Sequence, residues 1–225
     1  MKPVYIDNHI LVINKPAGLL SQADRTGDMD VLSIWKMYIK DRFHKPGNVF
    51  LGLVHRLDRP ASGLMILART SKAAARLSAA FARREVVKEY YAIVEGDVHI
   101  QGILTDYLVK EEGRVRTAAK TDDGARYAEL RLSAVESRRG LTLVKIQLQT
   151  GRSHQIRVQL SQRDMPILGD MRYGASRELD GKNLALHAFR LGLEHPVRLV
   201  PLEWKAPIPV SWPEDMRAIA GNQIQ

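Results

Sequence analysis

The sequence predicts an α+β fold with a mixed, mainly antiparallel central sheet flanked by helices and loops. Apolar and polar residues alternate over 128–134 and 144–148, which is typical of antiparallel strands with one buried face. Apolar residues at helical spacing predict helices over 31–43 and 72–84. Because no repeat or linker interrupts the chain, we expect one domain over residues 1–225, with a frayed tail from about 214.

The other elements follow from local residue types. β-rich runs at 4–6 and 10–13 flank Asp7-Asn8-His9 and predict a hairpin, and Thr70 or Ser71 is the expected cap of the second helix. Further strands are expected at 64–68, 90–94, 184–193 and 199–204. The segment 97–124 is mixed and turn-rich, and the Gly/Pro-rich segment 166–174 predicts a loop. A third helix is expected from about 152 to 162.

Composition limits the classes of protein that fit. The 225 residues include no cysteine, which excludes disulfides, thiolate metal sites and cysteine nucleophiles, and favours a cytoplasmic location. No signal peptide and no apolar run of membrane-spanning length is visible, so no membrane association is expected. The formal net charge of +9 favours a polyanionic partner such as nucleic acid.

The most informative segment runs from His55 to Leu64. Asp58 stands between Arg56 and Arg59, followed by Pro60, a Ser-Gly turn and an apolar run. A carboxylate held in this way suits a nucleophile, or an anchor for a cationic partner, better than a solvated surface charge.

Two further segments concentrate polar and aromatic residues. In Thr150–Leu160, Arg152, Gln155 and Gln159 can share one face of a helix, and a cation at a helix start is disfavoured by the dipole unless it binds something. In Lys88–Gly96, Tyr90 and Tyr91 lie on opposite faces of a strand, so one of them is free to line a pocket for an unpaired base.

The sequence lacks the motifs of metal sites, nucleotide-cofactor sites and serine hydrolases. His55, His154 and His187 do not have metal-ligand spacing and are better interpreted as hydrogen-bonded structural histidines, so no metal is expected. No glycine-rich phosphate loop is present, so no nucleotide cofactor is expected, and the serine-hydrolase elbow is absent.

Taken together, these motifs resemble the RluA-type family of RNA pseudouridine synthases. The resemblance rests on Asn14–Leu20, His55–Leu64, Lys88–Gly96, Thr150–Leu160, Pro166–Asp170 with Tyr173-Gly174, and Leu186–Ala188. Ala61 stands where the family usually has Thr, and Gln159 where it often has His. Because the chain starts almost directly at the first motif, we do not expect an amino-terminal S4-like domain.

The resemblance implies a pseudouridine synthase fold and isomerisation of uridine to pseudouridine in structured ribosomal or transfer RNA, without a cofactor and by a monomer. It implies that Asp58 is the essential carboxylate, which attacks C6 or C1′ or acts as a base at C2′; these roles stay open. Arg152 would pair with Asp58. Tyr90 would stack on the uracil and is a candidate for removing its C5 proton. Arg56 would fill the gap left by the flipped base or contact a phosphate.

Further residues are implied by their place in the motifs or by their charge. The expected substrate-binding residues are Arg56, His55, Leu57, His154, Gln155 and Leu186. The candidate contacts to the RNA backbone are Lys15, Arg59, Arg76, Arg83, Arg84, Arg114, Arg116 and Lys120.

Two alternatives remain open at this point. The first is a catalytically inactive RNA-binding module, or an RNA chaperone, on the same fold. The second is a glycoside or nucleoside hydrolase, which needs two carboxylates facing one bond. The hydrolase is disfavoured because no second acid lies within the Asp58 motif.

Overall fold

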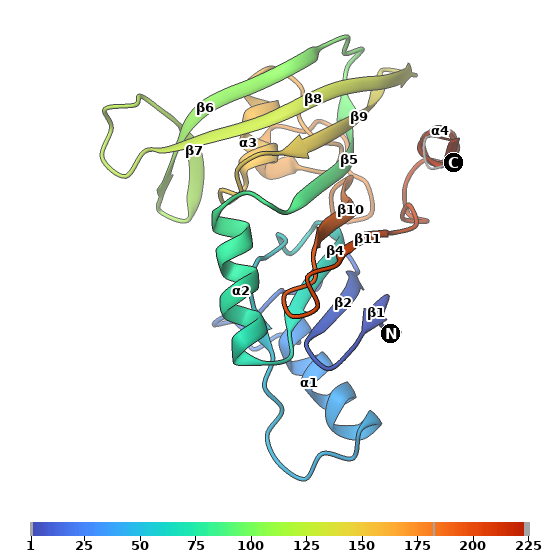
Figure 1. Ribbon diagram of the computed structural model, residues 1–225. Coiled ribbons are helices and arrows are strands. Elements are labelled where there is room, and N and C mark those ends of the chain that lie inside the picture. Colours follow the sequence, from blue (N-terminus) through green and yellow to red (C-terminus); the bar gives the residue numbers. More distant parts are fainter. Residues whose placement is uncertain (1, 182, 223–225) are drawn as a thin grey trace. The chain divides into compact units, whose positions relative to one another are not determined.

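The computed structural model describes residues 2–181 and 183–222, which form an α+β fold with a large, mostly antiparallel sheet (Figure 1). The expected fold class is therefore confirmed. The chain divides into two compact units, Met1–Val87 with Arg190–Ala206, and Lys88–Phe189 with Pro207–Gln225. The organisation as one domain over 1–225 stays a prediction.

Short antiparallel strands make the sheet of the first unit. They are β1 (Tyr5–Ile6), β2 (Ile10–Lys15), β3 (Gly52–Leu53), β4 (Ser62–Ala68) and, at its end, β11 (Pro201–Lys205). The predicted amino-terminal hairpin is confirmed, with Tyr5 opposite Val12. Strand β2 pairs along its whole length with β4, which places Lys15 opposite Gly63 and so brings the first motif beside the Asp58 segment.

Both helices of the first unit begin at residues that cap them. Helix α1 (Val31–Arg42) starts after Asp30, whose carboxylate accepts the backbone N–H groups of Leu32 and Ser33. Helix α2 (Ser71–Ala82) starts after Thr70, which confirms one of the two expected caps. Each cap satisfies N–H groups that have no partner inside the helix.

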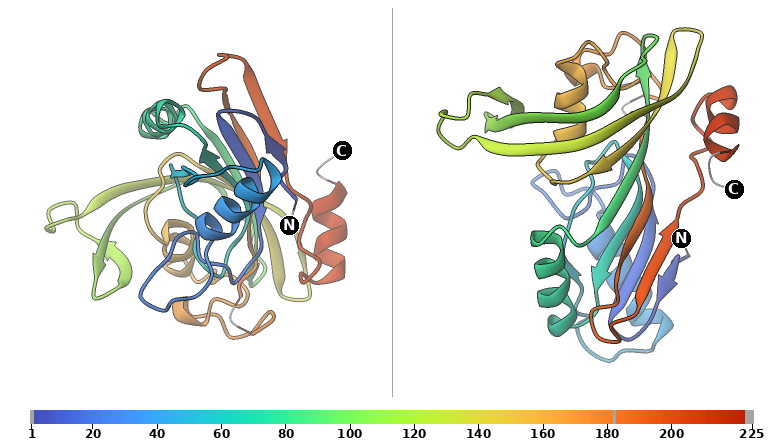
Figure 2. Two further views of the ribbon diagram at one scale, coloured as in Figure 1. Left: turned by 90° about the horizontal axis from the view of Figure 1, so that it is seen from below. Right: turned by 45° about the horizontal axis from the view of Figure 1, so that its top comes forward.

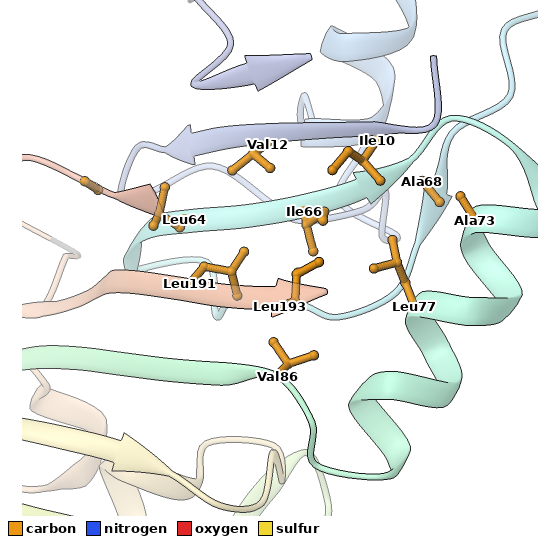
Figure 3. Close-up of a cluster of buried hydrophobic side chains, with 11 residues drawn as sticks. Ile10, Val12, Leu64, Ile66, Ala68, Ala73, Leu77, Val86, Leu191 and Leu193 are labelled. Carbon is orange, nitrogen blue, oxygen red and sulfur yellow. The ribbon is translucent and has the colours of Figure 1, made fainter. Parts of the chain in front are cut away.

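The core of the first unit joins α2 to the sheet (Figure 3). Ala73 and Leu77 of α2 pack against Ile66 and Ala68 of β4 and against Leu193. Strand β4 is buried at every position, because it pairs with both β2 and β3 and is covered by this cluster. The segment that follows Asp58 is therefore anchored in the most buried strand of the unit.

The second unit is built on longer antiparallel strands. They are β5 (Val87–Glu95), β6 (Gln101–Glu111), β7 (Arg114–Ala118), β8 (Arg126–Arg138) and β9 (Leu141–Leu148), in the order β5-β9-β8-β6-β7. The alternating strands β8 and β9 were expected. The segment 97–124, for which mixed, turn-rich structure was expected, contains β6 and β7. Only a few of their side chains are buried, so the alternation that marks a strand is weak there.

Helix α3 (Gln155–Ser161) lies against β6 and β7 in the second unit (Figure 2). Val158 packs with Leu108, Val115, Ala128 and Tyr173 in a small core. The helix is three residues shorter at its start than predicted, because His154 adopts a left-handed conformation with φ 50°. The loop expected at 166–174 holds a single 3₁₀ turn, η1 (Met171–Tyr173).

The carboxyl-terminal part adds one strand and one helix. Strand β10 is Leu186–Glu194, close to the strand expected at 184–193, and its second half pairs with β11. Helix α4 (Glu214–Asn222) occupies most of the expected tail, and residues 223–225 lie outside the described part of the chain. Within the described residues, no helix is long and apolar enough to span a membrane.

Candidate active site

The loop that carries Asp58 is fixed first at His55. The Nε2 atom of His55 accepts the backbone N–H of Ile66 at 3.0 Å, and its ring stacks on Phe81 with 4.7 Å between ring centres. The Nε2 atom can accept only when it carries no proton, so this nitrogen is unprotonated in the structure. His55 thus ties the start of the loop to β4 and α2.

Ser21 holds the residue before Asp58. Its hydroxyl donates to the carbonyl oxygen of Leu57 at 2.6 Å and accepts the backbone N–H of Leu57 at 3.2 Å. Both residues are buried. One hydroxyl therefore satisfies both polar groups of the Leu57 backbone, and sequence reasoning had assigned no role to Ser21.

Lys15 holds the residue after Asp58. Its Nζ atom donates to the carbonyl oxygen of Arg59 at 3.1 Å, and the backbone N–H of Gly18 donates to the same oxygen at 2.8 Å. Nζ also donates to the carbonyl oxygens of Pro16 at 3.0 Å and Leu19 at 2.8 Å. The lysine side chain thereby joins the first sequence motif to the Asp58 loop.

The environment of Lys15 decides its role. The residue is 0% exposed, so its prediction as an RNA-backbone contact is wrong: a phosphate cannot reach it. Burial lowers the pKa of Lys15 to about 7, and the nearby Asp58 carboxylate opposes this shift. Three carbonyl acceptors match the three N–H bonds of an ammonium group, so the geometry is that of the charged form.

Asp58 itself is half-buried at the turn that these anchors define. Its carbonyl oxygen accepts the backbone N–H of Ala61 at 3.1 Å, which closes the turn before Ser62 and β4. Arg56 is exposed and makes no hydrogen bond or ion pair with the described residues. Arg59 is exposed as well, and it pairs with Asp28 at 2.8 Å and donates to the carbonyl oxygen of Gly18. The backbone is thus fixed on both sides of a carboxylate that is only partly covered.

In the second unit, Arg152 lies in the turn before α3. Its Nε atom donates to the carbonyl oxygen of Tyr127 at 2.9 Å, and its backbone N–H donates to Oε1 of Gln155 at 3.0 Å. The predicted helical face of Arg152, Gln155 and Gln159 is wrong, because the helix begins only at Gln155. The guanidinium is instead oriented by the end of strand β8.

Gln155 is part of this support. Its Oε1 also accepts the Thr150 hydroxyl at 2.7 Å, and its Nε2 donates to the carbonyl oxygen of Glu129 at 3.0 Å. Gln155 is 2% exposed, and both ends of its amide are hydrogen-bonded inside the protein, so it has little of its side chain to offer a substrate; its substrate-binding role stays a prediction. It positions the Arg152 turn.

The rest of the motif also faces inward. The Nδ1 atom of His154 lies 2.8 Å from the Tyr173 hydroxyl, and Arg157 forms a buried two-bond ion pair with Asp170. Gln159, which departs from the family pattern, donates to Asp106 at 2.7 Å and is fully buried. This substitution therefore changes an internal contact between α3 and β6.

Tyr90 and Leu186 are both nearly covered. Tyr90 lies on β5 opposite Ile146 of β9, and Leu186 is the first residue of β10. Both are buried in the structure, so each can present only a small part of its side chain to a ligand. Their roles stay predictions.

The basic side chains predicted to contact the RNA backbone differ in whether they already form hydrogen bonds or ion pairs within the protein. Arg83 pairs with Glu85, and Arg116 pairs with Glu111. Arg76 donates to the carbonyl oxygen of Pro196, and Arg114 to that of Arg172. Among the predicted RNA-backbone contacts, the side chains of Arg84 and Lys120 are exposed and form no hydrogen bond or ion pair with the described residues.

Residues 9–162 match the family model described as RNA pseudouridylate synthase. The chain belongs to the RNA pseudouridylate synthase family. It is similar to the ribosomal large subunit pseudouridine synthase D of Yersinia pestis, with 34% identity over 97% of this chain and 70% of the relative. The corresponding protein of Vibrio cholerae is 36% identical, over 92% of this chain and 67% of the relative.

Solved structures agree with this assignment. The human RNA pseudouridylate synthase domain containing 4 has a TM-score of 0.78 and 27% identity, with 92% of this chain and 88% of that chain covered. The matched segment includes Asp58, Tyr90 and Arg152. The protein is an RNA pseudouridine synthase, an isomerase, and the resemblance inferred from the motifs is confirmed.

Proposed function

We propose that this synthase isomerises uridine in large-subunit ribosomal RNA and that Asp58 is its essential carboxylate. The observation that carries the proposal is the fixation of Leu57 by Ser21 and of Arg59 by Lys15, on the two sides of Asp58. A nucleophile or base acts fastest when its position is set before the substrate arrives. The names of the bacterial relatives favour ribosomal RNA over transfer RNA.

The reaction breaks the bond between N1 and C1′, turns the uracil and joins C5 to C1′, with loss of the C5 proton to solvent and gain of a proton at N1. Asp58 attacks C6 or C1′, or removes the C2′ proton, and each route requires an ionised carboxylate. We propose that Arg152 pairs with Asp58 and keeps it ionised and oriented. The support of Arg152 by Tyr127 and Gln155 is consistent with a guanidinium held for that purpose.

Tyr90 positions the base in this proposal. Its ring stacks on one face of the uracil, and Leu186 packs against the other face. Stacking is proposed over proton removal, because a phenol is a poor base at neutral pH. The target nucleotide must leave its stack to enter the site, which costs a few kcal/mol in a duplex and less in a loop. Arg56, exposed beside Asp58, enters the gap or binds a phosphate.

RNA affinity comes from cations that are not already paired. Arg84 and Lys120 have their charges available, whereas Arg83 and Arg116 would have to leave acidic partners. We propose that the protein acts as a monomer in the cytoplasm.

The substrate is tested with RNA that contains uridine tritiated at C5. The protein is incubated with ribosome-free large-subunit RNA, small-subunit RNA or bulk transfer RNA, and released tritium is measured. We expect release from large-subunit RNA, pseudouridine among the digested nucleosides and no free uracil. Release only from transfer RNA would overturn the proposed substrate, and free uracil would indicate a hydrolase.

A further inference from the structure

A groove of about 330 Å³ lies beside α1 in the unit that contains Asp58. It is lined by Lys36, Met37, Lys40, Gly47, Asn48 and Val49. Helix α1 packs inward through Val31, Trp35 and Ile39, so the groove lies along its opposite, exposed side. The loop that follows the helix forms the other wall, and Figure 1 shows it in light blue where the chain runs out from the end of α1.

Large apolar side chains in the segment that forms this groove are open to solvent, and Met37 lines the groove itself. Met37 is 52% exposed, Phe43 44% and Phe50 51%. The chain has only 4 phenylalanines, and these two bracket the loop wall at 44–49. The Phe43 ring is already stacked with the Arg69 guanidinium, 4.8 Å from the ring centre. Exposed large apolar groups gathered in one segment are typical of a binding surface.

The charge of the same surface is strongly positive. Residues 36–50 contain Lys36, Lys40, Arg42 and Lys45 against the single acid Asp41. None of these four cations forms an ion pair with the described residues. Lys40 and Arg42 stand in the last turn of α1, where cations complement the helix dipole. That effect does not account for Lys36, which precedes the last turn, or for Lys45, which follows the helix.

A second groove in this unit has an acidic lining, in contrast to the groove beside α1. It measures about 300 Å³, and its lining includes Glu85, Glu194 and Glu203. A polyanion is repelled by such a lining and attracted by the groove beside α1. Cations interleaved with exposed aromatic rings are the combination that binds single-stranded nucleic acid, because the rings stack on bases and the cations neutralise phosphates.

We propose that the α1 groove, defined by the six residues that line it and by Phe43 and Phe50, binds an unpaired stretch of the RNA outside the target nucleotide. Lys36 and Lys40 contact successive phosphates, and Phe50 stacks on a base. The proposal rests on the proposed function, since it assigns a second contact with the same RNA. It adds a surface that none of the predicted RNA contacts includes.

The test uses a single-stranded oligoadenylate of twelve nucleotides, which contains no uridine and so cannot be a substrate. Binding is measured by fluorescence anisotropy over a range of salt concentrations. The charge variant is Lys36→Gln/Lys40→Gln. The matched control, Lys2→Gln/Lys205→Gln, removes two charges elsewhere in the same unit.

We expect the Lys36→Gln/Lys40→Gln variant to bind at least fivefold more weakly than the control. The slope of log K against log salt should become shallower by roughly 1.4, because each lost contact to a single strand removes about 0.7. Lys36→Arg/Lys40→Arg should restore binding, which separates charge loss from misfolding. Phe50→Ala should weaken binding about tenfold with an unchanged salt slope.

Equal affinities of the charge variant and its control would overturn the proposal. Preferential binding of a polyglutamate peptide over oligoadenylate would also overturn it, and would identify an acidic protein segment as the occupant. Tritium release from uridine-containing RNA is measured on the same preparations. Loss of oligoadenylate binding with release intact separates this site from catalysis, and absence of release in the wild type counts only against the proposed function.

Discussion

The Nζ atom of Lys15 lies 3.1 Å from the carbonyl oxygen of Arg59, the residue that follows Asp58. This contact joins positions 44 residues apart in the sequence. Lys15, in the first motif, therefore fixes the backbone immediately after Asp58. The amino-terminal motif is therefore tied to the segment that carries Asp58, the proposed catalytic carboxylate.

The first prediction concerns Lys15→Met. The change removes the Nζ donor from the carbonyl oxygens of Pro16, Leu19 and Arg59, although Arg59 keeps the N–H of Gly18. The lost hydrogen bonds cost about 1–3 kcal/mol, partly offset by the removal of a buried charge. We expect lower stability in urea unfolding and turnover reduced at least tenfold, with RNA affinity within threefold. A folded variant with wild-type turnover would show that this anchor does not position Asp58.

The second prediction isolates the other anchor. Ser21→Ala removes both hydrogen bonds to the Leu57 backbone while it leaves Lys15 in place. Turnover of tritiated RNA should fall several-fold with little change in KM, because the loop loses rigidity and not affinity. Thr26→Ala, at an exposed site nearby, serves as the control. Equal turnover of the two variants would count against the anchor.

The third prediction tests the support of Arg152. Gln155→Leu removes the acceptor for the Arg152 backbone N–H and for the Thr150 hydroxyl. We expect about a tenfold loss of kcat with KM nearly unchanged, and partial recovery in Gln155→Glu, which keeps the accepting oxygen. A rise in KM alone would instead indicate that Gln155 contacts the substrate.

The fourth prediction concerns acid stability through His187. Burial lowers the pKa of His187 to about 4, and a hydrogen bond with the Pro207 backbone opposes the shift. Because the unfolded histidine takes up its proton near pH 6.5 and the folded one only near pH 4, the unfolded state binds more protons in between, and stability falls as pH decreases. The difference in unfolding free energy between wild type and His187→Leu should shrink by about 3 kcal/mol from pH 7 to 4. A difference independent of pH would contradict the shift.

Much of the fold was readable from the sequence where local pattern and burial agree. The alternation over 128–134 and the cap at Thr70 correspond to β8 and the start of α2. Strands β6 and β7 were missed because most of their side chains are exposed, so no period-two signal develops. The start of α3 was misplaced because the left-handed conformation of His154 has no signature in a non-glycine residue.

The site was readable as a set of motifs but not as a set of contacts. Asp58 stands out because it lies between two arginines, and Arg152 because it is a cation near a helix start. The match to the family model over both residues supports their choice as site candidates. The buried state of Lys15 and Gln155 could not be seen, because a lysine and a glutamine in polar motifs are usually exposed. Ser21 gave no signal, since its partner Leu57 is distant in the chain and is bound through the backbone.

The central claim is that Asp58 performs the chemistry and is not a contact for RNA. The most direct measurement compares Asp58→Asn with the control Asp123→Asn, an exposed acid in a turn, in tritium release and in RNA binding. We predict no release above the blank for Asp58→Asn, with RNA affinity within threefold of wild type, and full release for the control. Release by Asp58→Asn at a tenth of the wild-type rate or more would contradict the account.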